Sequence, residues 1–382
     1  MVTKRFQLAL FLVVVAVAAF LGFFPSTVLA QAPDQAVSSI QAVTDLAAGE
    51  VEAFWTEEMM SNAIPMPLRE ISGAPGQPPK GTAAPSGPMV IANSGEPGDI
   101  PHEQIIPQGQ IVPQGAQGPI EPLFGTSPFS YTRYRLFPDT VAQYKQFPYR
   151  MIGKLYFTIP GQGPFVCSGS SVNSTNNSVV WTAGHCVFTP GVGYHTNFLF
   201  VPALHMTSNP YGKWTVKQAF TLVGWQNGYS EYDHGALVMN ERGKKKIGNV
   251  IGFLGFAANV DRGQNWTIFG YPADARNLND TPPGFQFDGV HQEICATAWA
   301  TNDLGANGPQ TIGVGCDQTG GCSGGPWLID FSGFGGATNT LNGNNSYRYT
   351  SPNPPEDLKL YSPYFSDGAN NLRNAAQAVP VP

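Results

Sequence analysis

A serine enclosed by glycines lies near the end of the chain. Residues 320–326 read Gly-Gly-Cys-Ser-Gly-Gly-Pro and place Ser323 among two pairs of glycines. Glycine adopts backbone angles that other residues resist, so this composition predicts a tight turn that a substrate carbonyl can approach closely. The N–H groups of Gly321 and Ser323 could then donate hydrogen bonds to a developing oxyanion. A short glycine-rich stretch is equally typical of a surface loop, so its chemistry depends on what else the chain provides.

The chain also provides a histidine and an aspartate in suitable contexts. His185 lies in residues 182–186, Thr-Ala-Gly-His-Cys, and Asp233 precedes an apolar run at residues 236–239. A serine hydroxyl is a poor nucleophile until a histidine takes its proton, and the histidine needs a carboxylate to orient it. His185, Asp233 and Ser323 supply these three roles in one of the chain orders known for such triads. The three residues therefore predict acyl-transfer chemistry.

These motifs together resemble the chymotrypsin/trypsin-like serine peptidase family, over roughly residues 130–365. More narrowly, the chain resembles secreted microbial members that are similar to glutamyl endopeptidases. The matching stretches for the family are residues 167–170, 182–186, 233–239 and 321–326, and those for the narrower group are residues 200–202, 209–214, 270–272 and 316–321.

The body of the chain reads as an all-β protein. Its apolar runs, such as residues 154–159 and 197–201, are rich in β-branched and aromatic residues and are separated by Gly, Pro and Asn. This pattern favours a sandwich or a barrel. The family resemblance implies two packed six-stranded Greek-key barrels with the site in the cleft between them, in a peptidase domain spanning residues 129–382, here called the body.

Two segments precede the body. Residues 1–30 read as a secretory signal peptide, with Lys4 and Arg5, an apolar stretch and a small-residue cleavage site. The alternative is a membrane anchor. Residues 31–128, here called the leader, begin with apolar residues at helical spacing over residues 37–60 and continue in Pro, Gly and Gln. We predict a largely disordered propeptide or linker, against the alternative of a solubilising spacer.

The acidic residues are concentrated in the leader. It carries Arg69 and Lys80 against eleven acidic residues, whereas the body is nearly neutral and the whole chain has a net charge of −6. Nucleic-acid binding needs a basic patch, so we exclude a nucleic-acid partner. The histidines fit no zinc-binding spacing, and we predict neither a metal nor a cofactor.

Five cysteines in a secreted chain suggest two disulfides and one free thiol. Spacing alone permits other pairings. The resemblance implies a Cys167–Cys186 bridge beside the histidine and a Cys295–Cys316 bridge. Cys322 would then be free, at a position where trypsin-like enzymes carry the aspartate that binds the new N-terminal ammonium. We therefore predict a zymogen that matures without that ion pair, by cleavage between about residues 114 and 147.

Asp317 is a possible specificity residue. It lies six residues before Ser323, where the trypsin-like pattern carries the floor of its primary pocket, and an aspartate there would select Lys or Arg. The alternative is a turn aspartate bound by local backbone donors.

The sequence as a whole predicts a secreted, monomeric serine endopeptidase acting on proteins or peptides, with no membrane attachment after signal cleavage. Two alternatives remain. A catalytically inactive homologue could serve as a binding module, and an esterase would share the same acyl-transfer chemistry.

Overall fold

The computed structural model describes residues 33–41, 47–72, 87–99, 103–106, 124–136, 142–273, 286–332, 338–350 and 358–382. The predicted signal peptide lies outside these residues. Among the described residues, no helix has the length and apolar character needed to cross a membrane.

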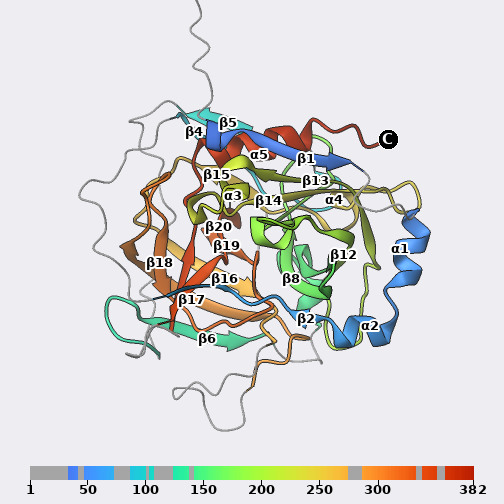
Figure 1. Ribbon diagram of the computed structural model, residues 1–382, viewed down its shortest axis with the longest axis horizontal. Helices are drawn as coiled ribbons and strands as arrows, with labels where there is room; N and C mark the ends of the chain where they lie inside the picture. Colours follow the sequence, from blue (N-terminus) through green and yellow to red (C-terminus); the bar gives the residue numbers. More distant parts are fainter. Residues whose placement is uncertain are drawn as a thin grey trace, which may run out of the picture. The chain divides into compact units, whose positions relative to one another are not determined.

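Six antiparallel strands form a closed barrel, drawn mainly in green at the right of Figure 1. The order is β13-β12-β7-β8-β9-β14, and β14 pairs back onto β13 to complete the ring. Their buried inward residues include many β-branched and aromatic side chains, which favour strands in these short runs. The strands are β7 (Ile152–Ile159), β8 (Gly163–Ser171), β9 (Val179–Thr182), β12 (Thr196–Pro202), β13 (Trp214–Leu222) and β14 (Gly235–Met239).

A second sheet is built from the C-terminal half, in orange and red. Its body strands follow the order β21-β22-β18-β17-β16-β19-β20-β15, and β6 pairs with β17. The predicted all-β fold is therefore confirmed, as a closed six-stranded barrel beside a second sheet. The strands are β6 (Tyr131–Arg135), β15 (Gly255–Ala258), β16 (Asn265–Gly270), β17 (Glu293–Asn302), β18 (Ile312–Gly315), β19 (Pro326–Ile329), β20 (Thr340–Asn344), β21 (Tyr347–Thr350) and β22 (Lys359–Ser362).

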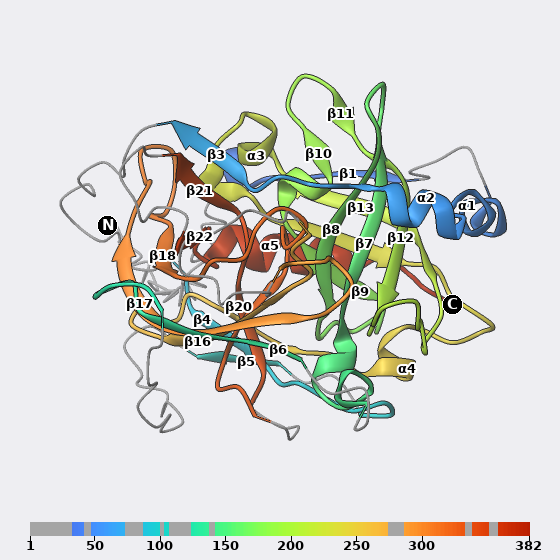
Figure 2. The ribbon, with the colours of Figure 1, turned by 90° about the horizontal axis from the view of Figure 1, so that it is seen from below.

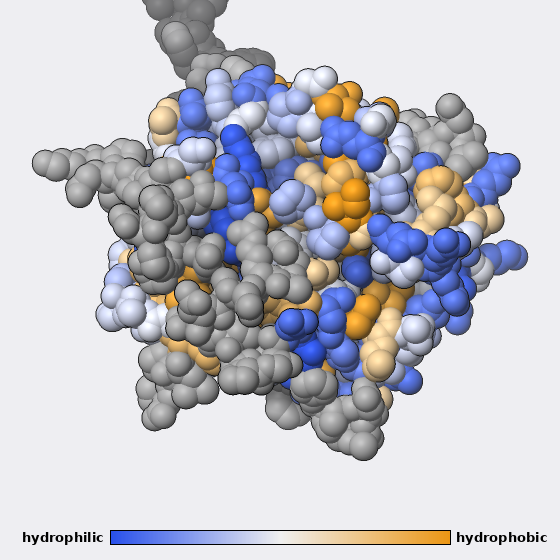
Figure 3. Space-filling view, turned by 60° about the horizontal axis from the view of Figure 1, so that its bottom comes forward, coloured by the Kyte–Doolittle hydropathy of each residue, from blue (hydrophilic) through white to orange (hydrophobic). Residues whose placement is uncertain are grey.

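One apolar core joins the two sheets. Trp181 of the barrel lies 5.5 Å from the Phe256 ring of the second sheet and 5.1 Å from Phe365, and all three side chains are buried. The C-terminal helix α5 (Asp367–Gln377) covers β14 and β13, where Arg373 donates to the Asn173 carbonyl oxygen at 2.7 Å. On the face shown in Figure 3, apolar side chains are scattered among polar ones.

The remaining body elements are short. They are the hairpin β10 (Phe188–Thr189) and β11 (Gly193–Tyr194), the helices α3 (Val223–Gln226) and α4 (Gly248–Ile251), and the 3-10 turns η2 (Gln143–Lys145), η3 (Tyr149–Met151), η4 (Gly184–Cys186) and η5 (Ser230–Tyr232).

The described parts of the leader are ordered, which differs from the predicted disorder. The turn η1 (Pro33–Gln35) is followed by β1 (Val37–Gln41), β2 (Ile64–Pro65), β3 (Arg69–Ser72), β4 (Met89–Ala92) and β5 (Glu103–Ile106), and β1 to β4 all pair with body strands. The predicted helical stretch becomes β1 and the helices α1 (Ala48–Phe54) and α2 (Glu57–Asn62). The described leader strands therefore take hydrogen-bond partners from strands of the body.

Trp55 shows how the leader is held. Its side chain is fully buried, its Nε1–H donates to the Asn197 carbonyl oxygen at 2.6 Å, and its ring lies 5.4 Å from Tyr156. Burying an aromatic side chain of this size contributes roughly 2–3 kcal/mol, which is enough to fix a segment that is otherwise polar.

Two body histidines lie inside the apolar core. His234 packs between Trp181 and Phe365, and His195 stacks 4.8 Å from the ring of Phe157. Burial lowers the pKa of each imidazole from 6.5 to about 4, although the Asp233 carboxylate opposes this for His234. Both rings are therefore neutral in the folded protein at pH 7.

We expect the free energy of unfolding to fall as the pH is lowered from 7 to 4. Between pH 6.5 and 4 the unfolded chain binds a proton at His234 and the folded chain does not, so protonation favours unfolding. Urea denaturation of His234→Gln at both pH values should show a drop smaller by up to about 3 kcal/mol. The surface variant Met206→Leu should keep the wild-type drop, and an unchanged drop in His234→Gln would refute this account.

Candidate active site

The turn that carries Ser323 needs two of its glycines. Gly321 and Gly324 have φ angles of +93° and +78°, which disfavour other residues. A Cβ atom on Gly321 would lie 2.7 Å from the Tyr271 carbonyl oxygen, and one on Gly324 would lie 2.1 Å from Thr182 Oγ1. The turn is therefore packed against the main chain of Tyr271 on one side and against Thr182 of β9 on the other. The glycine pattern predicted such a tight turn.

Ser168 of β8 ties this turn to the barrel. Its N–H donates to the Ser323 carbonyl oxygen at 2.8 Å, and its hydroxyl donates to the Gly321 carbonyl oxygen at 2.9 Å. The same hydroxyl accepts from the Tyr271 N–H at 3.0 Å. The carbonyl oxygens of Gly321 and Ser323 are thus bound to the barrel. The Gly321 N–H donates elsewhere, to the Met66 carbonyl oxygen.

Asn345 supports the turn from inside the second sheet, and the sequence analysis did not identify it. Its amide Nδ2 donates to the carbonyl oxygens of Cys322 at 2.9 Å and Phe269 at 3.1 Å. Its Oδ1 accepts from the Trp327 indole at 2.7 Å.

Cys322 is a fully buried free thiol, and burial raises its pKa to about 12, so it carries no charge beside the serine. This agrees with the prediction of a neutral cysteine at this position.

His185 and Asp233 meet in a two-point contact. The carboxylate accepts from the His185 N–H at 2.7 Å and lies 2.7 Å from His185 Nδ1, and it also accepts from the Ser346 hydroxyl at 2.5 Å. Asp233 is fully buried, which raises the pKa of its carboxyl. The imidazole and the hydrogen bonds outweigh burial, so the net pKa is lowered and the group stays ionised. Such a carboxylate fixes the proton of His185 on Nδ1 and leaves Nε2 to act as the base.

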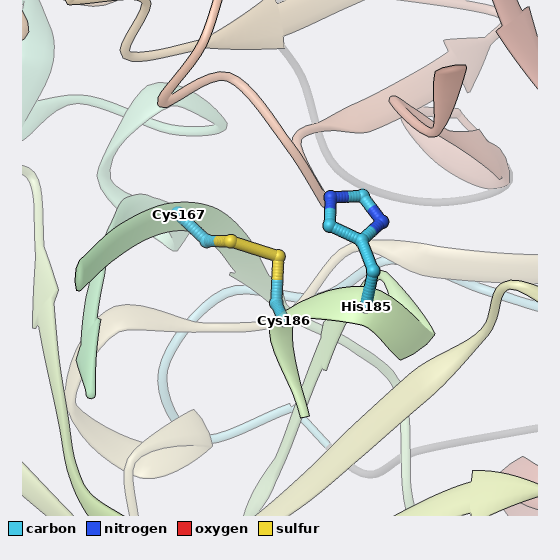
Figure 4. Close-up of side chains that lie close together, drawn as sticks. All are labelled: Cys167, His185 and Cys186. Carbon is cyan, nitrogen blue, oxygen red and sulfur yellow. A yellow bond between two sulfur atoms is a disulfide. The ribbon is translucent and has the colours of Figure 1, made fainter. Parts of the chain in front are cut away.

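Both predicted disulfides are present. Cys167 of β8 is bridged to Cys186, and Figure 4 shows His185 and Cys186 next to each other on the same short turn. The second bridge joins Cys295 of β17 to Cys316, just after β18. The first bridge anchors the histidine turn to the strand that also holds the serine turn. Both groups of three potential metal ligands among the described residues contain one of these disulfides, whose sulfurs are not thiolates.

No hydrogen bond joins the Ser323 hydroxyl to His185. The serine hydroxyl donates to the main-chain carbonyl oxygen of Met66 at 3.5 Å, and His185 Nε2 is buried without a hydrogen-bond partner among the described residues. Met66 belongs to the leader and lines the same groove, of about 370 Å³, as His185. The sequence analysis did not foresee this contact, because no sequence signal connects residue 66 with residue 323.

No family model matches the sequence. Protease Anisep from Arthrobacter nicotinovorans is 37% identical with a TM-score of 0.52, over 60% of this chain and 96% of its own. A thermostable serine protease, AL20, from an extremophilic microorganism is 32% identical with a TM-score of 0.51, over 60% of this chain and 98% of its own. The chain belongs to the chymotrypsin-like, V8-type serine peptidase family.

Curated relatives match a shorter stretch. A glutamyl endopeptidase of Bacillus licheniformis is 32% identical over 131 residues, 34% of this chain and 38% of that protein. An extracellular metalloprotease of Bacillus subtilis is 30% identical over 133 residues, 34% of this chain and 40% of that protein. The matches thus span about two fifths of these relatives.

Asp317, the possible specificity residue of this family member, is already paired. Its carboxylate forms an ion pair with Arg133 of β6, and the two side chains are 2% and 3% exposed. The Arg133 guanidinium also lies 4.6 Å from the ring of Phe124. A basic substrate side chain would have to displace Arg133 to reach Asp317, so the geometry argues against the predicted pocket role.

Replacing Asp317 tests this ion pair. Asp317→Asn should lower the free energy of unfolding by about 3–5 kcal/mol, because it leaves the Arg133 charge buried without its partner. The double variant Asp317→Asn with Arg133→Gln should recover part of that loss in urea denaturation. Cleavage preference on a peptide library should not change, and a lost preference for Lys or Arg would instead support the pocket role.

The Asp233 contact predicts a large effect on turnover. Asp233→Asn should lower kcat on a peptide substrate by about 10⁴-fold, because the amide no longer holds His185 in the required tautomer. Ser346→Ala, which removes one hydrogen bond to the carboxylate, should cost about tenfold. Asp261→Asn, at an exposed aspartate, is the matched control. Wild-type kcat in Asp233→Asn would contradict the assigned role.

Proposed function

We propose that the body is a secreted serine endopeptidase that hydrolyses peptide bonds through an acyl-enzyme. The single observation that carries the proposal is the Gly321 N–H, which donates at 2.9 Å to a peptide carbonyl oxygen lying beside Ser323. A site that holds a peptide carbonyl against a serine hydroxyl, next to a histidine paired with a buried aspartate, is suited to acyl transfer.

Each residue has a defined step in this proposal. His185 Nε2 takes the proton of the Ser323 hydroxyl as the oxygen attacks the scissile carbonyl carbon. The resulting oxyanion accepts from the N–H groups of Gly321 and Ser323. The protonated imidazole, held by Asp233, then gives its proton to the leaving amine, and the peptide bond breaks. Water, activated by the same histidine, hydrolyses the acyl-serine and restores the enzyme.

The alternatives explain less of the site. A binding module needs neither the His185–Asp233 contact nor an N–H aimed at a carbonyl oxygen. An esterase would use the same groups, but extended main chain paired along β8 and β21 favours a peptide ligand. Secretion is supported by the signal-like residues 1–30 and by a relative whose name describes it as extracellular.

We also propose that the protein is made as a zymogen and matures without an ammonium–aspartate pair. The neutral Cys322 thiol supports this, because it offers no carboxylate to a new N-terminus. The expected cleavage window, residues 114–147, includes β6, which is paired with β17 and carries Arg133. Cleavage before β6, within residues 114–130, would leave that strand and its ion pair in the mature enzyme.

Removing the serine hydroxyl tests the function. In the processed protein, Ser323→Ala should lower peptide hydrolysis by several orders of magnitude, since triad members act as a unit. A fluorophosphonate should label the wild-type protein at Ser323 and fail to label this variant. Thr207→Ala, on an exposed loop, should behave as wild type. Hydrolysis that persists in Ser323→Ala would overturn the proposal.

A further inference from the structure

Residues 64–72 of the leader cross the proposed active site. β2 pairs in parallel with β8 of the barrel, and β3 pairs in parallel with β21 of the second sheet. The residues between β2 and β3 therefore pass from one sheet to the other. Figure 2 shows this blue segment running from α2 past β8 to β3.

Main-chain atoms of Met66 occupy the centre of the site. Its N–H donates to the Val166 carbonyl oxygen at 2.8 Å, which fixes the peptide against β8. Its carbonyl oxygen accepts from the Gly321 N–H at 2.9 Å and lies 3.5 Å from Ser323 Oγ. The position that an oxyanion would take is thus filled by a neutral carbonyl of the chain itself.

This contact also keeps the nucleophile inactive. The Ser323 hydroxyl is directed to the Met66 oxygen, whereas His185 Nε2, which should take the serine proton, has no partner among the described residues. Ser323 and Asp233 are fully buried, and His185 is 4% exposed. A substrate carbonyl therefore cannot reach the serine while Met66 is in place.

Side chains after Met66 hold the segment down. Leu68 is 3% exposed within the core of the second sheet. The Arg69 N–H donates to the carbonyl oxygen of Ser346, and its guanidinium binds the Ser230 hydroxyl and lies 5.6 Å from the Trp225 ring. The Ser346 hydroxyl donates to the Asp233 carboxylate, so Arg69 is bound to a residue that also contacts the triad.

We propose that residues 64–72 are an intramolecular inhibitor that closes the proposed active site by placing the Met66 carbonyl in the oxyanion site. The inference rests on the proposed peptidase function. Because the segment is covalently attached, its effective concentration at the groove is in the millimolar range, so even a weak fit keeps the site filled. Cutting the chain between this segment and the body removes that advantage and allows the segment to leave.

The first experiment measures how fast Ser323 is labelled in the full chain. Wild-type protein should react with a fluorophosphonate at least tenfold more slowly than protein processed by limited proteolysis of the folded chain. Leu68→Asp with Arg69→Ala, in the unprocessed chain, should label at least tenfold faster than wild type. Glu58→Ala, on the exposed part of α2, is the matched control and should label as wild type does.

The second experiment does not depend on the variant folding. A peptide of residues 63–72, blocked at both ends, should inhibit the processed enzyme competitively when it is supplied at roughly millimolar concentration, the effective concentration of the attached segment. The same peptide with Leu68→Asp and Arg69→Ala should inhibit at least tenfold more weakly, and a peptide of residues 48–57 should not inhibit.

The outcomes separate the two proposals. If Ser323 remains unlabelled even after processing, the peptidase function is wrong. If full-length and processed protein are labelled at the same rate, or if the 63–72 peptide does not inhibit, the peptidase function stands and the inhibitory role of this segment is wrong.

Discussion

The contacts of Ser168 determine whether the two halves of the site meet at all. The histidine and aspartate belong to the barrel, whereas the serine turn belongs to the second sheet. Ser168 spans them, because its N–H and hydroxyl both bind carbonyl oxygens of the serine turn while its own carbonyl accepts from Thr182 Oγ1 at 2.8 Å. Thr182 in turn lies three residues before His185. A shift of one sheet against the other would break these bonds together, and such buried polar networks cost much more when partly satisfied.

The electrostatics of this site depends on two buried carboxylates, Asp233 and Asp317, each of which has a partner. Asp233 keeps its charge through the imidazole and two hydrogen-bond donors, and Asp317 is matched by Arg133. The Cys322 thiol, five residues after Asp317, is neutral. Asp233 and Asp317 are therefore each compensated by a neighbouring cation or by hydrogen-bond donors.

The sequence predicted those parts of the site whose signals are local. The glycine turn and the histidine turn are each written in a few adjacent residues. The family resemblance related them to one another and also supplied the two disulfide pairings, which join cysteines 19 and 21 residues apart. Asn345, Ser168 and Arg133 could not be found in this way, because each acts on a partner more than 20 residues away. The order of the described leader segments could not be predicted for the same reason. Its composition cannot form a core alone, and its ordering comes from strands of the body such as β8 and β21.

The leader strands also occupy both ends of the second sheet. Among the described residues, its order begins with β3 and ends with β4 and β5. An open sheet edge presents a row of unpaired peptide groups that can join another chain, and proteins commonly cover such edges. While the leader is attached, β21 and β15 are both covered, so the precursor presents no bare edge of body strand at either end. If the leader leaves after cleavage, as proposed, β21 and β15 become the outer strands of this sheet and their peptide groups lose these partners.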